Sequence, residues 1–194
     1  MSETISTAIL VGGLSTRMNG IPKALFTRDG KTLIERTLEQ FDPSSVFLVG
    51  NNKSLYKNLG LPIFKDHMIN KGAPGALVTA LLEAKSNWVR VLACDLPCLD
   101  SKTIGQLSPS PSHDVRLFHV DDRPQYLVSI WRQDVGMKLH ERLMRKDMGF
   151  RELLGGLRID WIEAINSKAF YNMNDIEAAR HVGFEPHRSS TESK

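Results

Sequence analysis

The fold and the chemistry of this chain are decided by Leu10-Val-Gly-Gly-Leu-Ser-Thr-Arg-Met-Asn-Gly-Ile-Pro-Lys23. The apolar run just before the glycines, residues 5–11, is typical of a buried strand. Gly12 and Gly13 lack a Cβ, so the backbone can turn sharply there and its N–H groups can approach a phosphate. Arg17 and Lys23 add two cations; arginine suits the leaving β,γ-phosphates and lysine the charge near the α-phosphate. The stretch therefore predicts a phosphate-binding loop.

This loop differs from the two common phosphate-binding motifs. A P-loop lysine follows a glycine and precedes Ser or Thr, whereas Lys23 follows Pro22 and precedes Ala24, and G-x-G-x-x-G is absent. The competing interpretation is a solvated loop whose basic residues arose by chance. The placement of both cations behind a strand and a double glycine favours the phosphate site.

Strand and helix patterns alternate through the first hundred residues. Apolar runs predict strands at residues 5–11, 45–49, 62–65, 87–93, 114–120, 125–130 and 157–162, and helical spacing predicts helices at residues 32–41, 55–59, 76–84, 101–107, 134–145 and 175–181. This order predicts an α/β fold in three layers, a Rossmann-like, mostly parallel sheet with helices on both faces. The nearly continuous apolar run at 87–93 predicts its central strand.

In such sheets ligands bind beyond the carboxyl ends of the strands. Asp95 ends the central strand in Val91-Leu-Ala-Cys-Asp-Leu-Pro97. A buried carboxylate is costly unless it is paired or binds a metal. Because Mg²⁺ is held by one or two carboxylates plus substrate phosphates, Asp95 is the candidate ligand of Mg²⁺, with Mn²⁺ as a second possible ion. The competing interpretation is an ordinary turn aspartate before Pro97.

Further polar residues follow other strands of the predicted sheet. Asn172 and Asn174 come after the last strand, where their carbonyls could support the metal or the phosphate site. Asn51 and Asp66 follow the second and third strands and are turn residues by composition. Gly75 opens a helix whose N-terminal N–H groups could meet an anion or a base edge.

The bulk composition excludes several classes of function. The 194 residues suit one good core, and a net charge of +3, from 25 basic and 22 acidic residues, suits an anionic small molecule better than nucleic acid. Two cysteines are too few for a disulfide framework or a structural zinc site. The start of the chain lacks a signal peptide and no apolar run would span a membrane, so we expect a cytoplasmic protein. No Ser-His-Asp or Cys-His arrangement is evident.

The glycine-rich loop resembles the signature L-A-G-G-x-S-x-R-M-G-x-x-K of the molybdenum cofactor guanylyltransferases, nucleotidyltransferases with a GT-A type fold. Cys94-Asp-Leu-Pro97 is similar to the C-D-x-P of that family, and Phe170-Tyr-Asn-Met-Asn174 to its F-x-N-x-N. Matches at Asp66, at residues 74–77 and at residues 123–128 follow the family's order, so the resemblance covers nearly the whole chain. Departures are Val11 for Ala, Asn19 for Gly, and Asp175-Ile176 for T-P.

The resemblance implies transfer of GMP from GTP to the terminal phosphate of molybdenum-molybdopterin, with Mg²⁺. It implies a single domain at residues 1–182, with a nucleotide-binding half to about residue 100, an acceptor half after it, and a polar tail at 183–194. The catalytic candidates are Arg17, Lys23 and Asp95. The candidate GTP-binding residues are Leu10, Val11, Gly12, Gly13, Arg17, Lys23, Asn51, Asp66, Gly75 and Asp95.

Several points stay open at the level of sequence. Cytidylyl relatives typically read L-A-A-G in the loop, so the glycine pair favours guanine. A sugar-phosphate acceptor and a non-catalytic nucleotide-binding adaptor are rival functions that the sequence leaves open. Transient contacts with proteins that supply or receive the cofactor are expected for the family, and a monomer is the default. The pterin phosphate has basic candidate partners, which would equally form a solvated face: Arg123, Arg132, Arg145, Lys146, Arg151 and Arg158.

Overall fold

The first strand lies inside a seven-stranded sheet because its residues are apolar on both faces. In β1 (Ile5–Leu10), Ala8 and Leu10 pack into one core cluster and Ile9 into another on the opposite face. The computed structural model describes residues 4–12, 18, 20–68 and 70–186. Gly13, Arg17 and Asn19 lie outside these residues, so the predictions made for them remain predictions.

The sheet has the order β5-β4-β1-β6-β8-β7-β9. β4 (Val46–Val49), β5 (Ile63–Phe64) and β6 (Trp88–Ala93) run parallel to β1. β8 (Arg123–Arg132) runs antiparallel to both β6 and β7 (Val115–Val120), and β9 (Ile159–Glu163) runs parallel to β7. The mostly parallel sheet and the central position of β6 are therefore confirmed.

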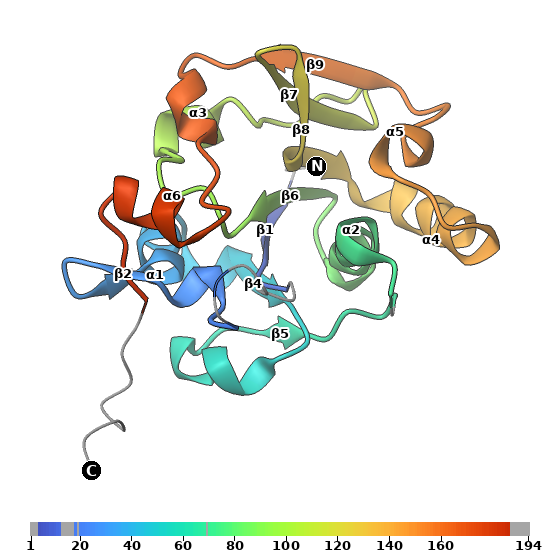
Figure 1. Ribbon diagram of the computed structural model, residues 1–194. Coiled ribbons are helices and arrows are strands. Elements are labelled where there is room, and N and C mark those ends of the chain that lie inside the picture. The colour runs from blue at the N-terminus through green and yellow to red at the C-terminus, as the bar shows by residue number, and fades with distance from the viewer. Residues whose placement is uncertain (1–3, 13–17, 19, 69, 187–194) are drawn as a thin grey trace.

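Helices cover both faces of the sheet, as the alternation predicted (Figure 1). α2 (Gly72–Glu83), α4 (Gly136–Arg145) and α5 (Phe150–Leu153) lie on one side. α1 (Leu33–Leu38), α3 (Ser101–Gly105) and α6 (Ile176–His181) lie on the other. The three-layer α/β architecture holds the carboxyl ends of β1, β4, β5 and β6 at one common edge.

Aspartate side chains cap two of the helices. Asp175 accepts a hydrogen bond from Ala178 N at 2.8 Å, and Asp100 accepts one from Thr103 N at 2.7 Å. Short 3-10 turns connect the remaining elements: η2 (Lys23–Leu25), η3 (Pro43–Ser45), η4 (Lys53–Leu59), η5 (Gln133–Val135) and η6 (Ser167–Phe170).

Several elements differ from the sequence prediction. α2 begins at Gly72 instead of residue 76, because the first turn of a helix tolerates Pro74, whose missing N–H would have no partner there. The predicted helix at residues 55–59 is part of the 3-10 turn η4. The short hairpin of β2 (Thr27–Arg28) and β3 (Lys31–Thr32) was not predicted, although its Asp29-Gly30 turn is a hairpin signal.

The polar tail begins later than residue 183. Phe184 is fully buried with Met18, Phe26 and Met173, and Glu185 pairs with Thr27 beside the hairpin. The Phe184 ring is apolar and is stabilised by burial in this cluster, although its sequence neighbours are polar. The prediction of a tail from residue 183 was therefore wrong at its first residues. No helix in the described ranges is long and apolar enough to cross a membrane.

Candidate active site

The ends of β1 and β4 approach each other closely at the edge of the sheet that holds the carboxyl ends of its parallel strands. We call this edge the ligand edge. Val11 N donates to Val49 O at 2.9 Å, and Gly50 N donates to Phe64 O at 2.9 Å. A Cβ on Gly50 would lie 2.8 Å from Val11 Cγ2 and 3.3 Å from Gly12 N. A larger residue at position 50 would therefore displace the Val11 side chain and press on the backbone that leads into the predicted phosphate-binding loop. Sequence patterns indicate no more than a turn at Gly50, because this packing role depends on the neighbouring strand.

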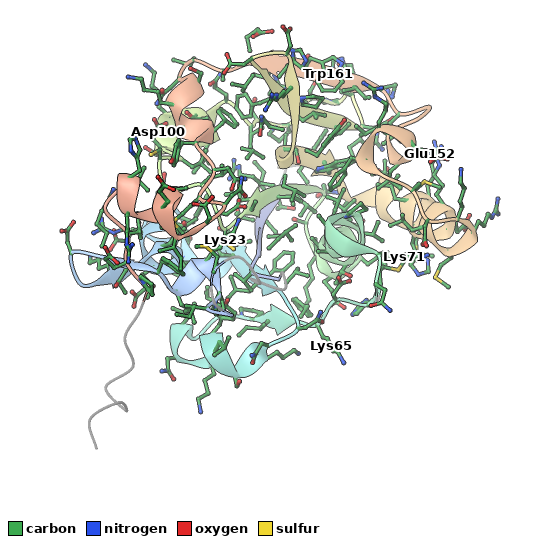
Figure 2. The ribbon with its side chains drawn as sticks, viewed as in Figure 1. Lys23, Lys65, Lys71, Asp100, Glu152 and Trp161 are labelled. Atoms are coloured by element: carbon green, nitrogen blue, oxygen red, sulfur yellow. The ribbon has the colours of Figure 1, made fainter. Side chains whose placement is uncertain are left out.

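Lys23 joins two polar residues that come from distant parts of the chain. Its Nζ donates to Asp95 Oδ2 and to Asn174 Oδ1, each at 3.1 Å. Met173 N donates to the Asp95 carbonyl at 2.9 Å, which fixes the segment after η6 against the end of β6. Figure 2 places Lys23 at the centre of the molecule, among the strand ends. The structure thus brings together three of the predicted residues.

The Asp95 carboxylate has one oxygen that the protein does not satisfy. Oδ2 accepts from Lys23, while Oδ1 is buried and has no hydrogen-bond partner within the described part of the chain. An unsatisfied, anionic oxygen at a ligand edge fits a hard cation such as Mg²⁺. Across the described ranges, His, Cys, Asp and Glu form no group of three or more that would hold a metal alone. A metal at Asp95 would therefore need further oxygen ligands, such as those of a substrate phosphate.

Asp66 and Gly75 fasten the loop after β5 to α2. Asp66 Oδ1 accepts from Met68 N and from Thr79 Oγ1, both at 2.9 Å. A Cβ on Gly75 would lie 2.8 Å from Met68 Cβ, so the loop packs directly on the first turn of the helix. Thr79, fully buried, was missed by the sequence reasoning; a polar residue on the apolar face of a predicted helix was its only signal.

The remaining predicted residues border the same edge without joining the Lys23 cluster. Leu10 and Val11 are buried at the end of β1, and Gly12 is exposed just beyond them. Asn51 is exposed, and the Asn172 carbonyl accepts from Asn174 N at 3.1 Å. Asn174 contacts Lys23, so the support predicted for it would act through the lysine.

Two ionisable groups beside the site are held in their neutral forms. Burial, with the negative charge of Asp95 as a second cause, raises the pKa of the Cys94 thiol to about 12. Burial also raises the pKa of Tyr56, whose hydroxyl donates to Val11 O at 3.4 Å. Both groups therefore stay protonated near neutral pH, so Cys94 is not a thiolate nucleophile.

Two of the basic candidates for the acceptor lie at the end of the sheet opposite the ligand edge. β8 runs antiparallel to β6, so Arg132 pairs with Trp88 at the opposite end of the sheet. Arg158 precedes β9 at that same end and binds Asp114 at 2.6 Å. For these two arginines the structure therefore favours the solvated face, the alternative that the sequence left open.

The other four basic candidates are Arg123, Arg145, Lys146 and Arg151. Arg123 begins β8 at the ligand edge and is exposed. Arg145 and Arg151 are also exposed, while Lys146 pairs with Glu152 at 2.9 Å. Pairing at the surface contributes little and leaves such a lysine available, so these residues remain candidates.

An α/β sheet whose parallel strands end beside a lysine and a carboxylate suits the binding of nucleotide phosphates, as nucleotidyltransferases require. Comparison with known proteins agrees. The model of the family described as MobA-like NTP transferase domain matches residues 7–160, and the chain belongs to this family.

Named relatives align over most of their length. The chain is 30% identical over 182 residues to a probable molybdenum cofactor guanylyltransferase of Clostridium perfringens, covering 88% of this chain and 92% of that protein. It is 30% identical over 181 residues to the molybdenum cofactor guanylyltransferase of Yersinia pestis, covering 90% and 92%. Molybdopterin-guanine dinucleotide biosynthesis protein A from Archaeoglobus fulgidus superposes with a TM-score of 0.76 at 19% identity, covering 92% of this chain and 96% of that one. This last likeness supports the fold.

Proposed function

We propose that this nucleotidyltransferase transfers GMP from GTP to the terminal phosphate of molybdenum-loaded molybdopterin. The observation that carries the proposal is the Lys23–Asp95–Asn174 cluster at the carboxyl ends of the strands. The names of the relatives at 30% identity support this choice of donor and acceptor.

The reaction needs charge neutralisation more than acid–base chemistry. An oxygen of the acceptor phosphate attacks the α-phosphorus of GTP, the bond to the β-phosphate oxygen breaks, and pyrophosphate leaves. Because the attacking phosphate is already an anion, no strong general base is required. The protonated Cys94 and Tyr56 agree with a route that has no covalent enzyme intermediate.

Lys23 and Asp95 have different electrostatic roles in this proposal. Lys23 holds a positive charge where the α-phosphate would lie, and Asp95 with Asn174 fixes the position of its ammonium group. Asp95 Oδ1, which is buried and unsatisfied among the described residues, would hold Mg²⁺. When bound, Mg²⁺ would supply further neutralisation of the phosphate charge. Arg17, outside the described residues, remains the candidate for the leaving phosphates.

Pyrophosphate release tests this assignment. The protein is incubated with Mg²⁺ and GTP, CTP, ATP or UTP, with and without molybdate-loaded molybdopterin. Release from GTP that depends on the acceptor is the expected result. Release with CTP instead would assign a cytidylyltransferase, and no acceptor-dependent release from any nucleotide would overturn the pterin acceptor.

The close approach at Gly50 gives a prediction about nucleotide binding. In Gly50→Ala the new Cβ would press on Val11 Cγ2 and on Gly12 N, so the loop that holds GTP should shift. We expect the Kd for GTP, measured by isothermal titration calorimetry, to rise about ten-fold, because overpacking a tight contact forces the neighbouring backbone to shift.

A second substitution shows whether the contact with Val11 is the cause. Val11→Ala removes the methyl group that lies 2.8 Å from the new Cβ, so the double variant should recover part of the lost affinity. Equal losses in the single and double variants would show that Val11 does not transmit the effect.

A further inference from the structure

β8 carries a bulge at the edge of the candidate active site. Leu117 of β7 pairs with Ser129, but the next residue, Phe118, pairs with Gln125, so residues 126–128 have no partner on β7. The bulge is fixed from inside, because Trp131 Nε1 donates to Ser129 Oγ at 2.7 Å and Ser129 Oγ donates to Tyr126 O at 2.8 Å. Bulges beside active sites can re-aim a side chain, and Tyr126 is one of the unpaired residues of this bulge.

Tyr126 lies flat against Phe150 of α5. The two ring centroids are 4.8 Å apart and the ring planes differ by 14°. This geometry is a parallel stack, whereas the pairs Phe47–Phe64 and Phe118–Phe170 meet edge to face. Both residues of the stack are only half-buried, so part of the aromatic surface stays open. We call Tyr126 and Phe150 the aromatic platform.

The aromatic platform lies at the ligand edge, on the side of the later half of the chain. Tyr126 precedes Val128 by two residues, and Val128 pairs with Leu92 near the end of β6, so Tyr126 lies beyond that pairing toward Asp95. Lys71, which precedes α2, forms an ion pair with Asp147, three residues before Phe150. The segment leading into α5 is thereby held at the start of α2, where Gly75 lies.

The geometry points to the aromatic platform as the binding site for the pterin ring of the acceptor. A flat heteroaromatic ring gains by stacking on aromatic side chains. Arg151, adjacent to Phe150 and exposed, offers a cation to anionic groups of such a ligand. This inference rests on the proposed function, because it takes the acceptor to be a pterin; the residues that bind it are new.

Binding of a pterin without turnover tests the platform directly. Neopterin monophosphate is titrated with protein, and quenching of its fluorescence gives a Kd in the absence of nucleotide. Tyr126→Leu and Phe150→Leu should each raise this Kd about ten-fold, the usual effect of losing one stacking ring. Tyr126→Phe and Phe150→Tyr keep a ring and should bind as the unmodified protein does.

Matched controls separate loss of the platform from loss of structure. Trp161→Leu removes an exposed aromatic residue on β9, which Figure 2 shows away from α5, and should leave the Kd for the pterin unchanged. The Kd for GTP should stay unchanged in all variants, which would show that the nucleotide half is intact.

A Leu variant that binds the pterin as tightly as the unmodified protein overturns the platform, as does an unmodified protein that does not bind it. Failure of the proposed function is a different result, namely no acceptor-dependent pyrophosphate release.

Discussion

Asp95→Asn is expected to lower the rate of acceptor-dependent pyrophosphate release by about 10³-fold, the upper range for losing one electrostatic contact in a transition state. The substitution keeps the size of the side chain and leaves the backbone carbonyl that accepts from Met173 N unchanged. It removes the negative charge that holds Lys23 and that the unsatisfied Oδ1 would offer to Mg²⁺. Single-turnover rates at saturating GTP and Mg²⁺ measure the effect on the chemical step.

A carboxylate at the opposite end of the sheet provides the matched control. Asp160 is ion-paired with Arg116 at 2.7 Å and is partly exposed, and Asp160→Asn makes the same chemical change away from the ligand edge. Its rate should equal that of the unmodified protein. If Asp95→Asn also keeps its rate, neither the metal nor the lysine acts through Asp95, and the proposed mechanism fails.

Local patterns predicted the parts of the fold and site that depend on neighbours in sequence. The apolar run ending at Gly12 is β1, the run at residues 87–93 is the central strand β6, and Asp95 lies at its end. Because parallel strands end at one edge, the rule that ligands bind there was enough to expect the candidate residues near each other.

Features that depend on distant partners could not be predicted in this way. Lys23 and Asn174 are 151 residues apart, and they meet where the segment after η6 is hydrogen-bonded to the end of β6 through Met173 N and Asp95 O. The bulge at residues 126–128 exists because Ser129 and Gln125 pair with consecutive residues of β7, and a register between strands is not determined by one strand alone. For the same reason, the sequence did not show that β8 runs antiparallel to β6, which puts Arg132 at the end of the sheet opposite Asp95.

Lys23→Met is expected to have two opposite effects. Loss of the cation should lower the rate of pyrophosphate release about 10²-fold, because charge on the transferring phosphate is no longer offset. In the absence of nucleotide, however, Lys23 occupies one oxygen of Asp95 at 3.1 Å and so competes with a metal for that carboxylate. The variant should therefore bind Mn²⁺ more tightly than the unmodified protein, as measured by the electron paramagnetic resonance signal of free Mn²⁺.

A surface lysine shows whether the change in Mn²⁺ affinity is specific to this contact. Lys31 forms an ion pair with Glu39 on the surface, and Lys31→Met makes the same change of net charge at a distance from the site. It should alter neither the rate nor the Mn²⁺ affinity, because exposed pairs contribute little and are screened by salt. If Lys23→Met lowers the rate but leaves the Mn²⁺ affinity unchanged, Lys23 acts on the phosphate alone and does not compete with the metal for Asp95.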